Sequence, residues 1–130
     1  MKLIRQLEFS APIKVISEAN RPGREHWSKK RNRELSQQTE ITVELHNALV
    51  NKRIELPCVV ILTRVGPKKL DPDNLANSFK AVQDAIAKKL GVDDGDEEKI
   101  DWVYDQTPIG KRQYSVKVRI QSVGGALSLD

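Results

Sequence analysis

The sequence has a single cysteine among its 130 residues, so no disulfide can form within the chain. That residue, Cys58, begins the apolar run 58–62, where we expect a buried and inert thiol, not a catalytic one. With only His26 and His46 beside it, one cysteine cannot assemble a standard structural zinc site. The fold must therefore be stabilised by its hydrophobic core, which a chain of this length can supply.

Long hydrophobic runs are also missing. No apolar stretch approaches the roughly 20 residues that cross a bilayer, and the N-terminal segment lacks the apolar region of a secretory signal. No Walker-type glycine loop precedes Lys111, and there is no G-x-S-x-G motif. We therefore expect a cytoplasmic protein with no membrane partner, and neither a nucleotide-triphosphate motor nor a serine acyl-transfer enzyme.

What is present indicates one compact α+β domain over residues 1–123, followed by a flexible tail over 124–130. No internal repeat, low-complexity tract or long linker divides the chain. The expected architecture is a mixed β-sheet with two main helices and a C-terminal β-hairpin. The expected elements are strands over 13–17 and 58–65, helices over 28–50 and 74–90, and a hairpin turning at 107–110.

Hydrophobic periodicity predicts which sides of these elements are buried. The nearly unbroken apolar strand 58–65 is typical of a central strand covered on both faces. In the helix 74–90 one apolar stripe recurs at steps of four, three, four and four, and Gly91 is placed to cap it. The predicted stripe consists of Leu75, Phe79, Val82, Ile86 and Leu90, and the predicted buried side of the helix 28–50 includes Leu35, Val43, Leu49 and Val50.

Two acidic clusters frame the second helix in a chain of net charge +4, with 71–74 before it and 93–96 after it. Because Pro72 favours an extended Asp71, the carboxylates of Asp71 and Asp73 should point to the same side. Neighbouring carboxylates repel, and a divalent ion such as Mg²⁺ relieves that repulsion. The alternative is that Asp71 and Asn74 only cap a helix that starts with proline.

The polar side of the second helix continues this acidic motif. Asp73, Asn77, Lys80 and Asp84 recur at steps of four, three and four, opposite the apolar stripe. Lys80 could reach back toward a phosphate near a metal ion. The alternative is a surface lysine paired with Asp84 four residues later. The spacing of oxygen ligands and turn glycine does not match a calcium-binding EF-hand loop.

A regular helix over 74–90 is about 25 Å long and would keep the two clusters apart. One solution is a shorter or bent helix that lets the chain fold back. The other is a site shared between two subunits across a two-fold axis, where opposite helix ends meet, and this is the hypothesis that we favour.

Basic residues exceed acidic ones by 22 to 18, and they concentrate around one tryptophan between positions 21 and 33. Such a segment can neutralise phosphates while an aromatic ring stacks on an exposed base, although a solvated loop has the same composition. The expected nucleic-acid contacts are Arg21, Arg24, Trp27, Lys29, Lys30, Arg31, Lys68, Lys69, Lys117 and Arg119.

Taken in order, the runs 70–75, 80–86 and 91–96 resemble the core of the RusA-type Holliday junction resolvases, endonucleases common in prophages, and the resemblance spans about Arg64 to Ile120. It implies a homodimer that depends on Mg²⁺, with Mn²⁺ as a substitute, and that resolves four-way DNA junctions in recombination and repair. It also implies catalytic, metal-binding roles for Asp71, Asp73 and Asp94, and a catalytic role for Lys80. Asp93 and Asp96 remain alternatives for the third carboxylate.

The implied reaction is metal-assisted hydrolysis of a phosphodiester. Two other functions fit the same residues. One is a non-catalytic DNA-binding module whose acidic clusters are only caps and turns, and the other is a nuclease that acts on other branched DNA.

Overall fold

The computed structural model describes residues 1–17 and 27–123, and these form an α+β fold, as expected. The predictions for Arg21, Arg24 and the tail 124–130 concern residues outside the described ranges. No helix of the described part is long and apolar enough to span a membrane. The elements are β1 (Lys2–Ile4), β2 (Gln6–Ala11), α1 (Trp27–Ala48), β3 (Lys52–Ile54), β4 (Cys58–Gly66), α2 (Pro72–Ser78), α3 (Lys80–Leu90), β5 (Ile100–Pro108) and β6 (Ser115–Ser122).

The main sheet has four strands in the order β2-β6-β4-β5, and β1 pairs with β3 in a separate two-stranded parallel sheet. Strand β4 is antiparallel to β6 and parallel to β5. The two C-terminal strands expected as a hairpin are present and antiparallel, but β4 lies between them, so they do not pair directly. The helices α2 and α3 supply the crossover that a parallel β4–β5 pair requires.

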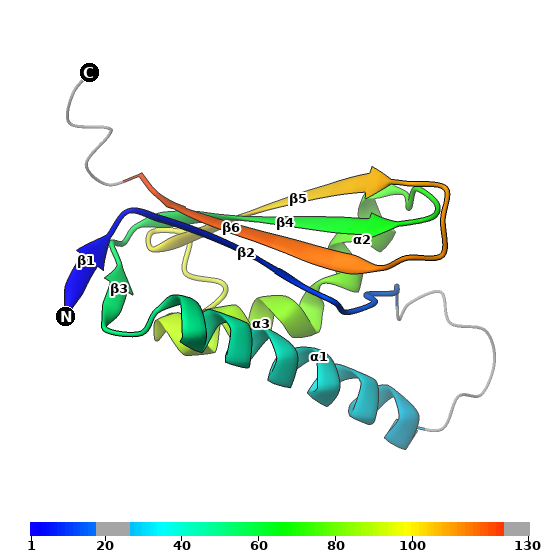
Figure 1. Ribbon diagram of the computed structural model, residues 1–130, viewed down its shortest axis with the longest axis horizontal. Helices are drawn as coiled ribbons and strands as arrows, with labels where there is room; N and C mark the ends of the chain where they lie inside the picture. The colour runs from blue at the N-terminus through cyan, green and yellow to red at the C-terminus, as the bar shows by residue number, and fades with distance from the viewer. Residues whose placement is uncertain (18–26, 124–130) are drawn as a thin grey trace.

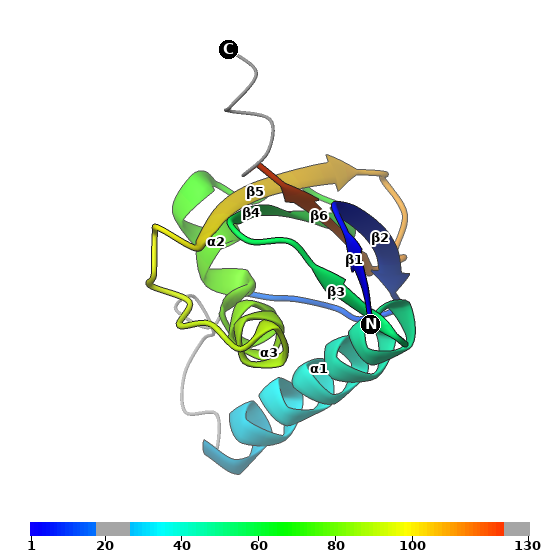
Figure 2. The same cartoon turned by 90° about the vertical axis from the view of Figure 1, so that its left-hand side faces the viewer.

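The helices α1 and α3 pack against one face of the main sheet (Figures 1 and 2). Every second residue of β4 is buried beneath them, including Val60 and Leu62. Cys58 is buried too, as expected, and burial raises the pKa of its thiol to about 11. No described helix or strand covers the opposite face, so the expected cover on both faces of β4 is found on one face only.

The first helix agrees with the predicted range, but its buried side was predicted correctly only in part. Its buried residues are Gln37, Ile41 and Leu45, and Leu49 packs against the core as predicted, whereas Leu35, Val43 and Val50 each remain about half exposed. Gln37 can be buried because its Nε2 donates a hydrogen bond to the carbonyl oxygen of Lys14 at 3.0 Å. No strand forms over 13–17, and the N-terminal strand of the main sheet is β2 instead.

The second predicted helix is divided at Phe79, where φ is −95° and ψ is 3°. Phe79 is fully buried, and its ring stacks on Tyr104 with the centroids 5.9 Å apart. The predicted stripe is confirmed, because Leu75, Val82 and Ile86 are also buried. Gly91 ends α3 with φ at +74°, a left-handed conformation that favours glycine. The helical segment is therefore shorter and bent, which was one of the two expected solutions.

Candidate metal centre and nucleic-acid interface

The first acidic cluster caps α2. Asp71 accepts hydrogen bonds from the backbone N–H and the side-chain amide of Asn74, at 2.9 and 2.7 Å. Asn74 in turn accepts a bond of 2.8 Å from the hydroxyl of Ser17. Pro72 occupies the first turn, and Asp73 follows it as an acidic residue near the positive end of the helix. Asp71 thus has the capping role, and an ionised carboxylate still keeps lone pairs for a second partner.

Two buried or half-buried polar side chains fix the loop that leads to Asp71. The amide of Gln106 on β5 bonds both backbone groups of Leu70, at 2.8 and 2.9 Å. Arg64 on β4 donates to the carbonyl oxygen of Lys68 at 2.8 Å, and burial lowers the pKa of its guanidinium. A Cβ added at Gly66 would lie 3.0 Å from that guanidinium, so a larger residue there would crowd the Arg64 side chain.

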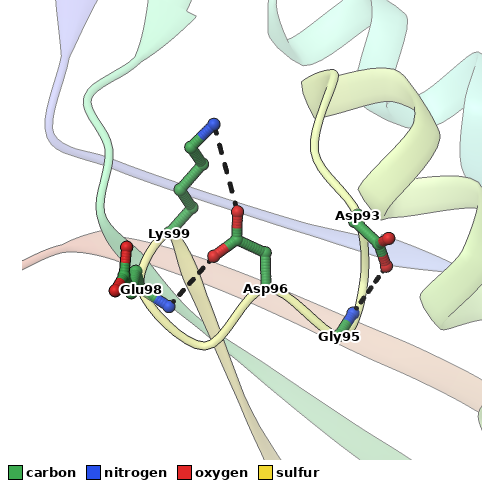
Figure 3. Close-up of polar contacts among 5 residues, drawn as sticks. All are labelled: Asp93, Gly95, Asp96, Glu98 and Lys99. Carbon is green, nitrogen blue, oxygen red and sulfur yellow. Dashed lines mark hydrogen bonds and ion pairs between the residues drawn. The ribbon is translucent and has the colours of Figure 1, made fainter.

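The second acidic cluster forms a compact loop between α3 and β5 (Figure 3). Asp93 accepts a hydrogen bond from the N–H of Gly95 at 3.0 Å, and Asp96 accepts one from the N–H of Glu98 at 3.1 Å. The carbonyl oxygen of Asp94 accepts a bond of 2.9 Å from the indole N–H of Trp102. Because Asp93 and Asp96 stabilise turns, Asp94 is the member of the cluster whose carboxylate contacts another element.

That contact is with Asp84 on α3. The pKa of Asp84 is raised, first by burial and then by a side-chain hydrogen bond with Asp94 and by the charge of Asp94. Lys80 is close enough to oppose this rise. Asp84 precedes the end of α3 by six residues, about 9 Å of helix, so the loop has folded back along it. Within one chain, the loop after α3 returns Asp94 to the polar side of that helix.

Tyr104 lies between the two acidic clusters. One side borders a shallow surface hollow that it shares with Asp71 and Asp105. On the other side, its hydroxyl donates to the amide oxygen of Gln83 at 2.5 Å, and Asp94 contributes to raising its pKa, after the larger effect of burial. Among residues 1–17 and 27–123, however, no three Asp, Glu, His or Cys side chains gather as a metal-ligand group. Asp71, Asp73 and Asp94 are thus not collected into one triad in the single chain.

The donor chemistry of the Asp84–Asp94 pair fits a divalent cation. Mg²⁺ prefers hard oxygen ligands and is commonly bound by one or two carboxylates, its remaining positions being filled by water and substrate phosphate. Sequence reasoning placed Asp84 on the polar side of the helix but did not include it among the metal ligands. The available signal was its position four residues after Lys80 on that face.

Several predicted DNA-binding residues border the same region. A cleft of about 290 Å³ between α1 and α3 is lined by Lys30, Glu34, Lys80 and Asp84, among others. Lys30 forms an ion pair of 3.9 Å with Glu34. Lys29 and Arg31 are exposed beside it in the first turns of α1, and Trp27 at its start is 69% exposed. The start of α1 and the polar side of α3 therefore form one continuous charged surface.

The remaining predicted basic residues are distributed over two other places. Lys68 and Lys69 are exposed in the loop before Asp71, and Lys69 borders the hollow next to that carboxylate. Lys117 and Arg119 alternate with the buried Val118 on β6, so they project from the face of the sheet opposite the helices. The structure does not bring these two residues to the Asp84–Asp94 pair.

Neither the models of known protein families nor the curated proteins give a match to this chain. What the protein does is therefore inferred from its own residues and their geometry.

Proposed function

We propose that the protein is an Mg²⁺-dependent endonuclease that cuts branched DNA, with four-way junctions as its substrate class. The observation that carries the proposal is the contact of Asp84 with Asp94 next to Lys80. Two carboxylates this close disfavour each other's ionisation, and a divalent cation would remove that cost. The order of the acidic motifs along the chain, which resembles the RusA-type resolvases, points to the same chemistry.

In this proposal Asp84 and Asp94 hold the metal ion. The described part of the single chain does not gather Asp71 and Asp73 with this pair, so Asp71 belongs to the site only if Asp71→Asn impairs cleavage. The bound ion would supply Lewis-acid activation for phosphodiester hydrolysis. Lys80, on the same side of α3 as Asp84, places positive charge where a phosphate would approach. The fixed loop before Asp71 limits how far that carboxylate can move.

DNA would be bound by the charged surface that joins the start of α1 to α3. Lys29, Lys30 and Arg31 can neutralise phosphates, and the exposed Trp27 can stack on an unpaired base. Such contacts do not read base sequence, so preference would come from the shape of the branched substrate. A homodimer would present two such sites, as paired cuts across a junction require.

The test compares cleavage of a synthetic four-way junction with that of a linear duplex of matched sequence, with Mg²⁺, with Mn²⁺ and with EDTA. We expect metal-dependent cleavage of the junction, loss of cleavage in Asp94→Asn, and retained cleavage in the control Asp96→Asn, since the carboxylate of Asp96 is occupied by Glu98 and Lys99 of its own loop. Junction binding that no metal converts into cleavage would favour the DNA-binding module. Equal cleavage of flaps and junctions would favour a broader branched-DNA nuclease.

A further inference from the structure

The uncovered face of the main sheet is apolar along its centre. The outward residues of β4 are Val59, Ile61, Thr63 and Val65, which are only partly exposed, and Val103 on β5 is 42% exposed. Since its inward residues are buried in the core, β4 is apolar on both faces. Such a pattern is typical of a strand covered on both faces, yet no described element covers this one (Figure 2).

The two flanks of this face carry opposite charges. On β6 the outward residues include Lys117 and Arg119, and on β5 they include Asp101 and Asp105. The register places Lys117 and Asp105 on either side of Thr63, in one row across the sheet. The outer face of the three strands is therefore basic on one side, largely apolar in the middle and acidic on the other.

We propose that this outer face binds a second copy of the chain about a two-fold axis that runs along β4. This symmetry stacks β4 on β4 and places β6 of each copy over β5 of the other. Lys117 would then meet Asp105 of the second copy, and Arg119 would lie near Asp101 and Asp105 of that copy. The apolar side chains of β4 would be buried between the two sheets.

Charge selects this arrangement over its alternatives. A two-fold axis perpendicular to the strands would place β6 on β6 and bring lysine and arginine against themselves, which is repulsive. A DNA strand on this face would meet the phosphate-repelling carboxylates of Asp101, Asp105 and Glu8, the last lying opposite Arg119 on β2. A second copy is the occupant that complements both flanks. The interface builds on the homodimer of the proposed function, but it can be tested without any cleavage assay.

The experiment is a charge-exchange test by sedimentation velocity. Lys117→Glu alone places glutamate against aspartate in both contacts of the dimer, and Asp105→Lys alone places lysine against lysine. We expect each variant to dimerise at least about tenfold more weakly than the wild type, because like charges are brought together twice. An equimolar mixture should recover the dimer, since each contact of the heterodimer then pairs opposite charges.

Matched charge reversals away from this face, Lys88→Glu on α3 and Glu40→Lys on α1, should leave association unchanged, and circular dichroism verifies that every variant is folded. A wild type that stays monomeric at the highest concentration tested would overturn the inference. So would a mixture that associates no better than its components. Weaker DNA binding by Lys117→Glu without any change in association would make nucleic acid the occupant. A monomer that still cleaves junctions would refute this interface and the homodimer, but not the nuclease activity. A dimer that cleaves no DNA would refute the nuclease proposal, but not this interface.

Discussion

The two acidic clusters have similar compositions but different surroundings. Asp71, at the start of α2, accepts two hydrogen bonds from Asn74, so its negative charge is satisfied by donors of its own helix. Asp94, after α3, lies against another carboxyl group, that of Asp84, whose pKa is raised by burial and by Asp94 itself. The comparison teaches that the number of carboxylates does not locate a cation site. We expect a cation instead at the Asp84–Asp94 pair, where one carboxyl group faces another.

The largest effect is expected from Asp84→Asn. If the pair holds the metal ion, junction cleavage should fall by about 100-fold or more, because an amide is a weaker ligand and carries no charge. Glu34→Gln is the matched control, since Glu34 lies in the same cleft and is already paired with Lys30. Cleavage rates at saturating Mg²⁺ measure the difference. An Asp84→Asn enzyme as active as the wild type would remove this pair from the metal site.

A smaller effect distinguishes two possible roles of Asp71, helix capping and metal binding. Asp71→Ala should lower the free energy of unfolding by about 1 kcal/mol, since it removes the N-cap, whereas Asp71→Asn keeps an efficient cap. If Asp71 also completes the metal site, Asp71→Asn should be folded as stably as the wild type but impaired in cleavage. Urea unfolding and cleavage of the same samples give both quantities. If Asp71→Asn is fully active, the role of Asp71 is limited to capping α2.

The smallest effect concerns the pH dependence of stability. The raised pKa of Asp84 means that the folded state holds this proton more tightly than the unfolded chain does. The stability that the protonated group contributes is therefore present below the unfolded pKa, about 3.9, and is lost as the pH rises through the higher folded pKa.

Asp84→Asn does not titrate at this position. In EDTA it should gain stability relative to the wild type as the pH rises above about 4, and Mg²⁺ should then stabilise the wild type more than the variant. Thermal melts over this range measure both changes. If the difference in stability between Asp84→Asn and the wild type is the same at every pH, the result would argue against a contact between two carboxyl groups.

Local spacing predicted much of the fold because it acts directly on burial. The stripe through Leu75, Phe79, Val82 and Ile86 is buried as expected. The division at Phe79 was not predictable, since the stripe continues through it. Nor does a turn signal at 107–110 reveal that β4, far away in sequence, inserts between β5 and β6. On α1 a single hydrogen bond from Gln37 accompanies the burial of a polar residue, while Leu35 stays largely exposed.

The candidate site shows the same limit. The polar face with Lys80 and Asp84 follows from helical spacing, and so does the capping role that was weighed for Asp71. The approach of Asp94 to Asp84 depends on the path of the loop 91–99. That path is set by a series of short turns, each of only two or three residues. Arg64 donates a hydrogen bond to the loop before Asp71, and its guanidinium lies in the space next to Gly66. That space exists only once β4 has folded.

The buried Phe79 has a mechanical consequence for the molecule. Its ring is held against Tyr104 of β5 at the point where the helical hydrogen-bond pattern is interrupted. The Phe79–Tyr104 pair thus anchors the adjoining ends of α2 and α3 to the sheet, while one acidic cluster lies at the opposite end of each helix. Because Arg64 and Gln106 also fix the loop before Asp71, α2 is held to the sheet at both of its ends, and the two acidic clusters keep their separation.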